Sequence, residues 1–280
     1  MKRIAACLLT ILLCLACPAW AEDVFLPDGA EIERTETSYR SQHIAIDITA
    51  MRIEHSDVYI ADIRVKDVTS FRRAFGGGAW KTQSQKVREL AEENGAILAM
   101  TGDNAHLLAS GWVVGNGEAL RDTANTQRDI CLLYRNGEMR AIPAQNVEPD
   151  QLTADMEELW QVFCFGPSLL DAEGRAQTTF NSDVNPANPR SVIGYYEPGH
   201  YCFVQVDGRG TASVLEPRRT SRGLTLQRLS ALMEELGCAA AYNLDGGQSS
   251  LMWFGGSVLS SPYKGGRRVG DIVLIAEPVP

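Results

Sequence analysis

The chain has 280 residues, of which 45% are hydrophobic and 22% are charged, so it is long enough for one large globular domain or two small ones. Its formal net charge of -9 argues against a protein that binds nucleic acid through a basic surface. We see no internal repeat, low-complexity tract or long linker that would divide the chain, and we therefore expect a single domain.

Residues 1–21 predict a secretory signal peptide. Lys2 and Arg3 supply its positive start, Ile4 to Ala16 its apolar core, and Ala19-Trp20-Ala21 a small-x-small cleavage site. The apolar run is short for a transmembrane helix. We therefore expect a chain that is secreted or held in the cell envelope, without stable membrane insertion after cleavage. A lipoprotein is the less favoured alternative.

The polar segment 22–43 is expected to be a loosely ordered lead-in, and the folded domain to cover 44–280. Alternation of apolar and polar residues predicts strands at Ile44–Ile48 and Val58–Val65, with Val68–Phe71 extending the pattern.

A helix is predicted over Thr82–Asn94, where Thr82 and Gln85 form a capping box. The short apolar run Ala96–Met100 follows as a buried strand and leads into the polar cluster 101–104. Further strands are predicted at Gly111–Val114, Ile130–Tyr134, Met139–Ile142, Gln161–Phe165, Ser191–Tyr195, Tyr201–Val206, Leu251–Phe254 and Ile272–Ala276.

Two later segments predict helices, a short one at Thr153–Leu159 and a clearer one at Thr225–Leu236, which Thr225 can cap and Gly237 can end. Strands outnumber helices and do not alternate regularly with them. This pattern favours the α+β class, with a mixed, largely antiparallel sheet core and a few packed helices.

Four cysteines follow the signal peptide: Cys131, Cys164, Cys202 and Cys238. None forms a CxxC pair, so a zinc site is disfavoured, and the sequence does not choose among the three connectivities that four cysteines allow. None of the four histidines has a metal-binding spacing such as HExxH, and no GxSxG or nucleotide-binding motif is present.

The densest polar stretch runs from Asn243 to Ser250, where glycines allow tight turns and close approach to a ligand. Other polar clusters lie at or near the ends of predicted strands: 101–104, 165–168, 188–190 and 207–209. Together these clusters indicate a site for an anionic, sugar-like ligand.

Each residue type in these clusters has a chemical role and a structural alternative. Arginine binds phosphate in a bidentate manner, and a carboxylate can act as acid, base or nucleophile at a sugar carbon. An Asp-Gly after a strand is equally often a simple turn, and an arginine near an aspartate is often a structural pair. The catalytic candidates are Asp103, Asp207 and Asp245, and the substrate-binding candidates are Arg190, Arg209, Asn243, Gly246, Gly247, Ser249 and Ser250.

The order of these clusters resembles the phosphodiester glycosidase family over about Ile44 to Ile275. The resemblance is strongest at 221–226 and 243–247, and 115–117, 165–167, 188–190 and 207–209 follow the expected order. Where the family often has a third glycine this chain has Gln248, where it often has a threonine this chain has Leu251, and Thr101 stands where it often has an asparagine. These differences would narrow the pocket or alter its sugar preference.

The resemblance implies hydrolysis of the bond between a sugar anomeric carbon and a phosphodiester in a glycan or glycoconjugate. In that reading Arg190 and Arg209 hold the phosphate and one of the three aspartates assists at the anomeric carbon. Two alternatives stay open: a non-catalytic binder of anionic cell-envelope glycans, and, ranked last, a metal-dependent phosphoesterase. The sequence requires no cofactor, leaves a divalent cation open, and names no metal ligand.

Overall fold

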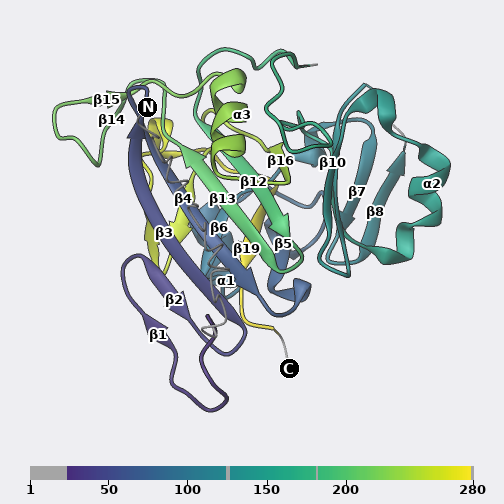
Figure 1. Ribbon diagram of the computed structural model, residues 1–280, viewed down its shortest axis with the longest axis horizontal. Helices are drawn as coiled ribbons and strands as arrows, with labels where there is room; N and C mark the ends of the chain where they lie inside the picture. The colour runs from purple at the N-terminus through teal and green to yellow at the C-terminus, as the bar shows by residue number, and fades with distance from the viewer. Residues whose placement is uncertain (1–23, 124–126, 181, 279–280) are drawn as a thin grey trace, which may run out of the picture.

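The computed structural model describes residues 24–123, 127–180 and 182–278, so the expected signal peptide lies outside the described residues. The chain is α+β, with 39% of it in strands and 16% in helices (Figure 1). The sequence predicts a mixed, largely antiparallel sheet core, and all pairings between the described strands are antiparallel.

The first sheet has seven strands and forms the front of the molecule in Figure 1. Its central strands are buried along nearly their whole length, because one face packs on the other sheets and the other on a helix. In spatial order the strands are β1 (Glu33–Arg34), β2 (Ser38–Arg40), β3 (Ile44–Ile53), β4 (Ser56–Val65), β13 (His200–Val206), β12 (Arg190–Glu197) and β16 (Ala240–Asn243).

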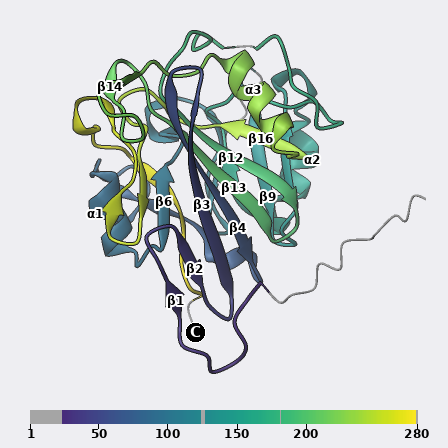
Figure 2. The same ribbon diagram turned by 60° about the vertical axis from the view of Figure 1, so that its left-hand side comes forward.

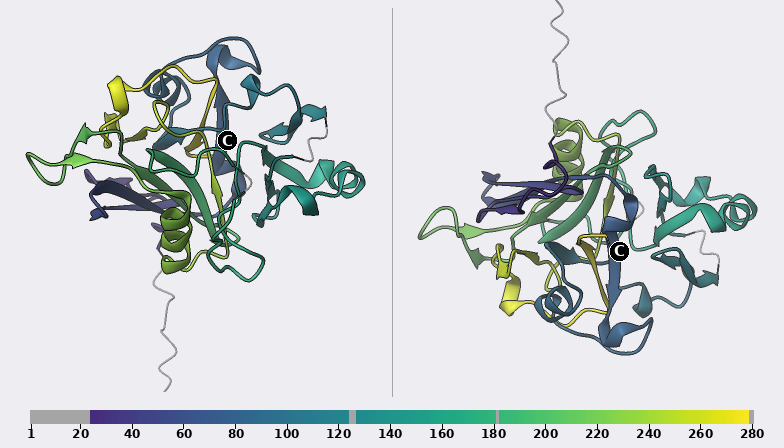
Figure 3. Two further views of the ribbon diagram at one scale, coloured as in Figure 1. Left: turned by 90° about the horizontal axis from the view of Figure 1, so that it is seen from above. Right: turned by 90° about the horizontal axis from the view of Figure 1, so that it is seen from below.

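Two further sheets have five strands each. The second sheet lies behind the first, and the third stands at one side of the molecule with helix α2 (Figure 3). In spatial order the second sheet has β18 (Ser257–Val258), β17 (Met252–Phe254), β6 (Leu98–Thr101), β19 (Asp271–Ile275) and β5 (Phe71–Phe75). The third sheet has β10 (Met139–Ile142), β9 (Ile130–Tyr134), β11 (Leu159–Phe163), β7 (Gly111–Gly115) and β8 (Glu118–Thr123). A small two-stranded ribbon is formed by β14 (Thr211–Ala212) and β15 (Thr220–Ser221).

The main core fills the space between the sheets. At its centre the Phe71 ring meets the edge of Phe203, with ring centroids 5.4 Å apart. On the opposite face of the first sheet, Leu229 and Met233 of α3 (Leu226–Glu235) pack against strands β4, β12 and β13 (Figure 2). The first sheet is therefore covered on both faces, which holds the ends of β12 and β16 firmly.

Most of the predicted strands are confirmed, and β9 and β10 have the predicted bounds. The helix predicted at Thr225–Leu236 is also confirmed, with the Thr225 hydroxyl accepting the Arg228 N–H at 3.2 Å. Within the expected lead-in, β1 pairs with β2 and β2 pairs with β3, so this segment extends the first sheet.

Three local predictions are wrong. Val68–Ser70 is a 3-10 turn, and the strand begins only at Phe71. Helix α1 covers Val87–Glu93, because the Thr82 hydroxyl donates to the Gly76 carbonyl instead of capping a helix. The helix predicted at Thr153–Leu159 lies earlier, as α2 (Pro149–Ala154), and a 3-10 turn separates it from β11.

Candidate active site

A pocket of about 250 Å³ lies where β12 begins and β16 ends. It is bounded by the 184–190 segment and by the Gly-rich loop after Asn243. We call it the main pocket. Its lining residues are Phe165, Val184, Asn188, Pro189, Arg190, Arg209, Asn243, Asp245, Gly246, Gly247, Gln248 and Arg267.

Asp245 is the one carboxylate lining the main pocket within the described part of the chain. Its Oδ2 accepts bonds from the amide of Asn104, the hydroxyl of Ser249 and the guanidinium of Arg267, the last at 2.7 Å. All three donors bind the same oxygen, so Oδ1 has no donor among the described residues. The side chain is thus fixed in orientation while one oxygen stays available to a ligand.

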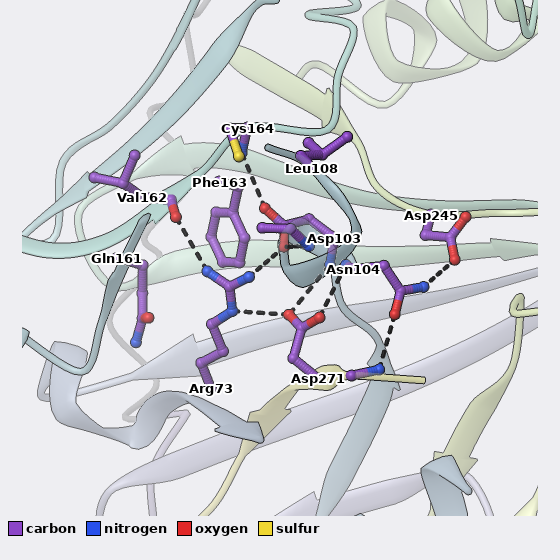
Figure 4. Close-up of polar contacts among 12 residues, drawn as sticks. Arg73, Asp103, Asn104, Leu108, Gln161, Val162, Phe163, Cys164, Asp245 and Asp271 are labelled. Atoms are coloured by element: carbon purple, nitrogen blue, oxygen red, sulfur yellow. Dashed lines mark hydrogen bonds and ion pairs between the residues drawn. The ribbon is translucent and has the colours of Figure 1, made fainter. Parts of the chain in front are cut away.

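The Asn104 side chain connects Asp245 to a buried ion cluster (Figure 4). Its side-chain amide oxygen accepts the Gly270 N–H at 2.8 Å, and the backbone N–H of Asn104 donates to Asp271 at 2.9 Å. Asp271 in turn accepts from Nε of Arg73 at 2.8 Å. Because Asn104 has a φ of 48°, it occupies a left-handed conformation that asparagine tolerates.

Asp103 lies in this ion cluster and does not line the main pocket. It is fully buried and pairs with Arg73, and its oxygens also accept the N–H groups of Ala105 and Cys164. Burial raises the pKa of Asp103 to about 6, and the Arg73 charge opposes the increase. This geometry suits a group that holds the ends of β6 and β11 together.

Arg190 brings positive charge into the main pocket. Its side chain is nearly inaccessible and donates to the carbonyls of Leu224 at 3.0 Å and of Val184 and Pro186 at 2.6 Å. No described carboxylate lies within salt-bridge distance of it. Burial, assisted by the charge of Arg209, lowers the pKa of Arg190 to about 10, which leaves it charged at neutral pH. A buried, uncompensated guanidinium favours an anionic ligand.

Arg209 faces the Gly-rich loop from the opposite side. Its Nε donates to the Asn188 side chain at 3.1 Å, and its guanidinium lies 5.4 Å from the centre of the Tyr263 ring. A Cβ on Gly247 would come within 2.7 Å of this guanidinium, and one on Gly246 within 2.5 Å of the Pro189 carbonyl. Both glycines are therefore required for the loop to approach Arg190 and Arg209 closely.

Asn243 completes the pocket wall. Its amide nitrogen donates to the Gly166 carbonyl at 2.8 Å, whereas its amide oxygen is buried without a hydrogen-bond partner in the described structure. A buried acceptor of this kind costs free energy.

Besides Asp103, three further predicted site residues do not line the main pocket. Asp207 is buried beneath the chain at Ser261, whose N–H it accepts at 2.8 Å, and burial raises the pKa of Asp207 to about 7. Ser249 touches the pocket indirectly through Asp245 and Arg267. Ser250 points into the core, where its hydroxyl lies 3.0 Å from that of Ser191.

The sequence prediction missed Arg267 and Asn104 as site residues. Arg267 lies in an irregular segment with no recognisable motif, although its position in a Gly-Gly-Arg-Arg run is a weak sign of a charged loop. Asn104 was noted only as part of a polar cluster. Asn104 belongs to the site because it contacts Asp245, which is 141 residues away in the sequence. Arg267 contacts the same carboxylate from another loop. Local sequence patterns do not reveal either contact.

Among the described residues, no three His, Cys, Asp or Glu side chains converge as a metal site. The four cysteines are free and buried, with the sulfurs of Cys202 and Cys238 at 3.8 Å. In the part of the chain that the structure describes, no helix is long and apolar enough to span a membrane.

The main pocket is thus lined by three arginines, Arg190, Arg209 and Arg267, and by one carboxylate of the described residues, Asp245. The model of the phosphodiester glycosidase family matches residues 86–276, and the chain belongs to this family. It is 28% identical over 213 residues to the SPbeta prophage-derived uncharacterized protein YomE of Bacillus subtilis (strain 168), a match that covers 70% of this chain and 30% of that protein's length.

Two solved structures share the fold at low sequence identity. The catalytic domain of zebrafish N-acetylglucosamine-1-phosphodiester alpha-N-acetylglucosaminidase, auto-inhibited by its pro-peptide, has a TM-score of 0.65 and 19% identity, covering 84% of this chain and 83% of that one. A hypothetical protein from Synechocystis has a TM-score of 0.57 and 13% identity, covering 89% and 64%. At these identities the likeness concerns the fold.

Proposed function

We propose that the protein hydrolyses the bond between a sugar anomeric carbon and a phosphodiester. One observation carries this proposal: two charged side chains line the same pocket. They are the buried Arg190, which has no carboxylate partner among the described residues, and Asp245, whose orientation is fixed by hydrogen bonds. Family membership supports the same reaction class. The signal-like residues 1–21 support an exported enzyme that acts on a glycan or glycoconjugate.

In the proposed reaction, the bond from the anomeric carbon to the phosphate oxygen breaks and its electron pair leaves with the phosphate. Arg190 and Arg209 stabilise this negative charge, while Oδ1 of Asp245 faces the positive charge that develops at the sugar carbon. Water then adds a hydroxyl to the anomeric carbon and its proton is released. A phosphate ester leaves readily, so a second carboxylate is not required as a general acid.

The proposal makes Asp245→Asn the decisive variant. It keeps the size of the side chain and removes its charge, so release of sugar from a sugar-1-phosphodiester should fall by about 100-fold or more. Asp47→Asn, at an exposed position on β3, is the matched control and should keep full activity. Because the proposed reaction uses no cofactor, chelation should leave the rate unchanged.

The assay separates this function from its alternatives. A folded protein that releases no sugar from any of several sugar-1-phosphodiesters would contradict the proposal. Binding of such compounds without turnover would favour a glycan-binding protein, and activity lost on chelation and restored by a divalent cation would favour a metal-dependent phosphoesterase.

A further inference from the structure

Two buried cysteines lie together on the face of the first sheet that α3 covers. Cys202 is on β13, and Cys238 is in the connection between α3 and β16. Both belong to one hydrophobic cluster, and they are 0% and 3% exposed. Their sulfur atoms are 3.8 Å apart, a distance at which no other atom lies between them. The sulfurs therefore need only a short further approach to reach the about 2.05 Å of a disulfide bond.

Gly194 of β12 provides the space in which the two sulfurs meet. It lies directly opposite Cys202 in the pairing of β12 with β13. A Cβ on Gly194 would come within 2.6 Å of the Cys202 sulfur and within 2.9 Å of the Cys238 sulfur. Gly194 does not have a positive φ, so the glycine supplies space rather than backbone freedom. Any other residue at this position would push the two sulfurs apart.

The surroundings of the pair favour Cys238 as the attacking sulfur. The hydrogen bond with Cys202 lowers the pKa of the Cys238 thiol, although burial opposes this effect, and Tyr196 acts in the same direction as Cys202. The same hydrogen bond, together with burial, raises the pKa of the Cys202 thiol. Cys202 is thus the S–H donor and Cys238 the acceptor. Thiol–disulfide exchange begins with the thiolate, so it begins at Cys238.

We propose that Cys202 and Cys238 form a disulfide bond when the protein meets a disulfide oxidant, such as oxidised glutathione or the disulfide of a thiol oxidoreductase. The Cys238 thiolate attacks one sulfur of the oxidant and displaces a thiolate. Cys202 then loses its proton, and its sulfur attacks the Cys238 sulfur and displaces the second thiolate. The two cysteines lose two electrons and two protons, and the oxidant becomes two thiols.

The bond connects two strands that are not neighbours in the first sheet. Strands β13 and β16 lie on either side of β12, and the bridged residues are 36 positions apart in the sequence. Strand β16 is the last strand of this sheet and ends at Asn243, which lines the main pocket. The bridge therefore anchors this strand to the interior of the sheet. It does so whatever reaction the pocket performs.

Peptide mapping tests the bond directly. The reduced, folded, full-length protein is incubated with oxidised glutathione, then denatured, alkylated and digested. We expect one linked pair of peptides, containing Cys202 and Cys238, that is lost on reduction. Cys131 and Cys164 are internal controls, because they lie in two different hydrophobic clusters and should be alkylated as free thiols. The proposal is overturned if Cys202 and Cys238 are both alkylated, if either carries glutathione at the end of the incubation, or if either is linked to another cysteine.

Thermal unfolding measures the anchoring by the bridge. The oxidised protein should unfold roughly 5–15 °C above the reduced protein, because the cross-link restricts the unfolded chain. Cys238→Ala should give the same Tm with and without the oxidant, whereas the matched variant Cys131→Ala should keep the difference. The comparison of oxidised and reduced wild type stands even where a variant does not fold. A linked wild-type protein that unfolds at or below the temperature of the reduced form would overturn the anchoring.

Discussion

Asn104 is the residue through which the buried ion cluster acts on the pocket. One side chain binds Asp245 with its nitrogen and the Gly270 N–H with its oxygen, and its backbone N–H is held by Asp271. Asn104 therefore links the Asp245 carboxylate to the buried ion cluster of Arg73, Asp103 and Asp271, which holds it in place (Figure 4). Under the proposed function, Asn104 is a positioning residue, since it contacts Asp245 rather than the substrate.

Variants at Asn104 should change kcat more than KM. Asn104→Gly removes the side chain but permits the positive φ, so a loss of about 10-fold or more in kcat would report lost orientation of Asp245. Asn104→Asp keeps the acceptor for Gly270 and places a second negative charge beside Asp245. We expect it to shift the acidic limb of the pH–kcat profile upward, because a like charge raises a carboxyl pKa. An unchanged profile, with the protein folded, would contradict the positioning role.

The residues that line the main pocket show how much of the site the sequence predicts. Asp245, Arg190, Arg209 and Asn243 were expected at one site and do share one pocket, because strand ends and Gly-rich loops mark such positions in any sequence. Asp103 has the same local appearance, an aspartate after a buried strand, yet it pairs with Arg73. Only the position of Arg73 on β5, which lies beyond β19 in the second sheet, distinguishes the two cases, and a local pattern contains no such information.

At the scale of elements, the strands with clear alternation and a turn signal were predicted well, as in the β9–β10 hairpin. The start of α1 was not, because Gln85 forms a bridge with Val269 and is thereby held out of the helix. Such a tertiary contact overrides the local capping pattern. At the start of α3 the Thr225 hydroxyl does cap the helix, by accepting the Arg228 N–H, and both ends of α3 follow the sequence rules.

The N-terminus of α3 also supports the main pocket, since the Leu224 carbonyl just before it accepts Nε of Arg190. Thr225→Ala removes the cap and should lower the free energy of unfolding by about 1 kcal/mol. Thr225→Ser keeps the hydroxyl and should lie close to wild type. Chemical denaturation measures both values. Equal stability of the alanine variant and the wild type would show that the packed face of α3, rather than its cap, determines where the helix begins.

At the scale of the whole molecule, Asp207 makes stability depend on pH. It lies directly after β13 of the first sheet and accepts the N–H of Ser261, which lies between strands β18 and β19 of the second sheet. Burial raises its pKa to about 7 in the folded protein, and the Asp57 charge adds to this, although the Ser261 N–H opposes it. Its Oδ1 is buried without a hydrogen-bond partner in the described structure, so the charged form is poorly accommodated.

The sign of the effect follows from the raised pKa. The folded state holds the Asp207 proton more tightly than the unfolded chain, where the pKa is near 4. Its contribution to stability is therefore full below about pH 4 and is lost as the pH rises through about 7. Since one unit corresponds to about 1.4 kcal/mol, the loss is at most roughly 4 kcal/mol. Asp207→Asn cannot ionise, so its free energy of unfolding should fall less than that of the wild type between pH 4 and pH 8. Parallel denaturation curves across that range would show that Asp207 is already ionised in the folded protein, with an unrecognised donor at Oδ1.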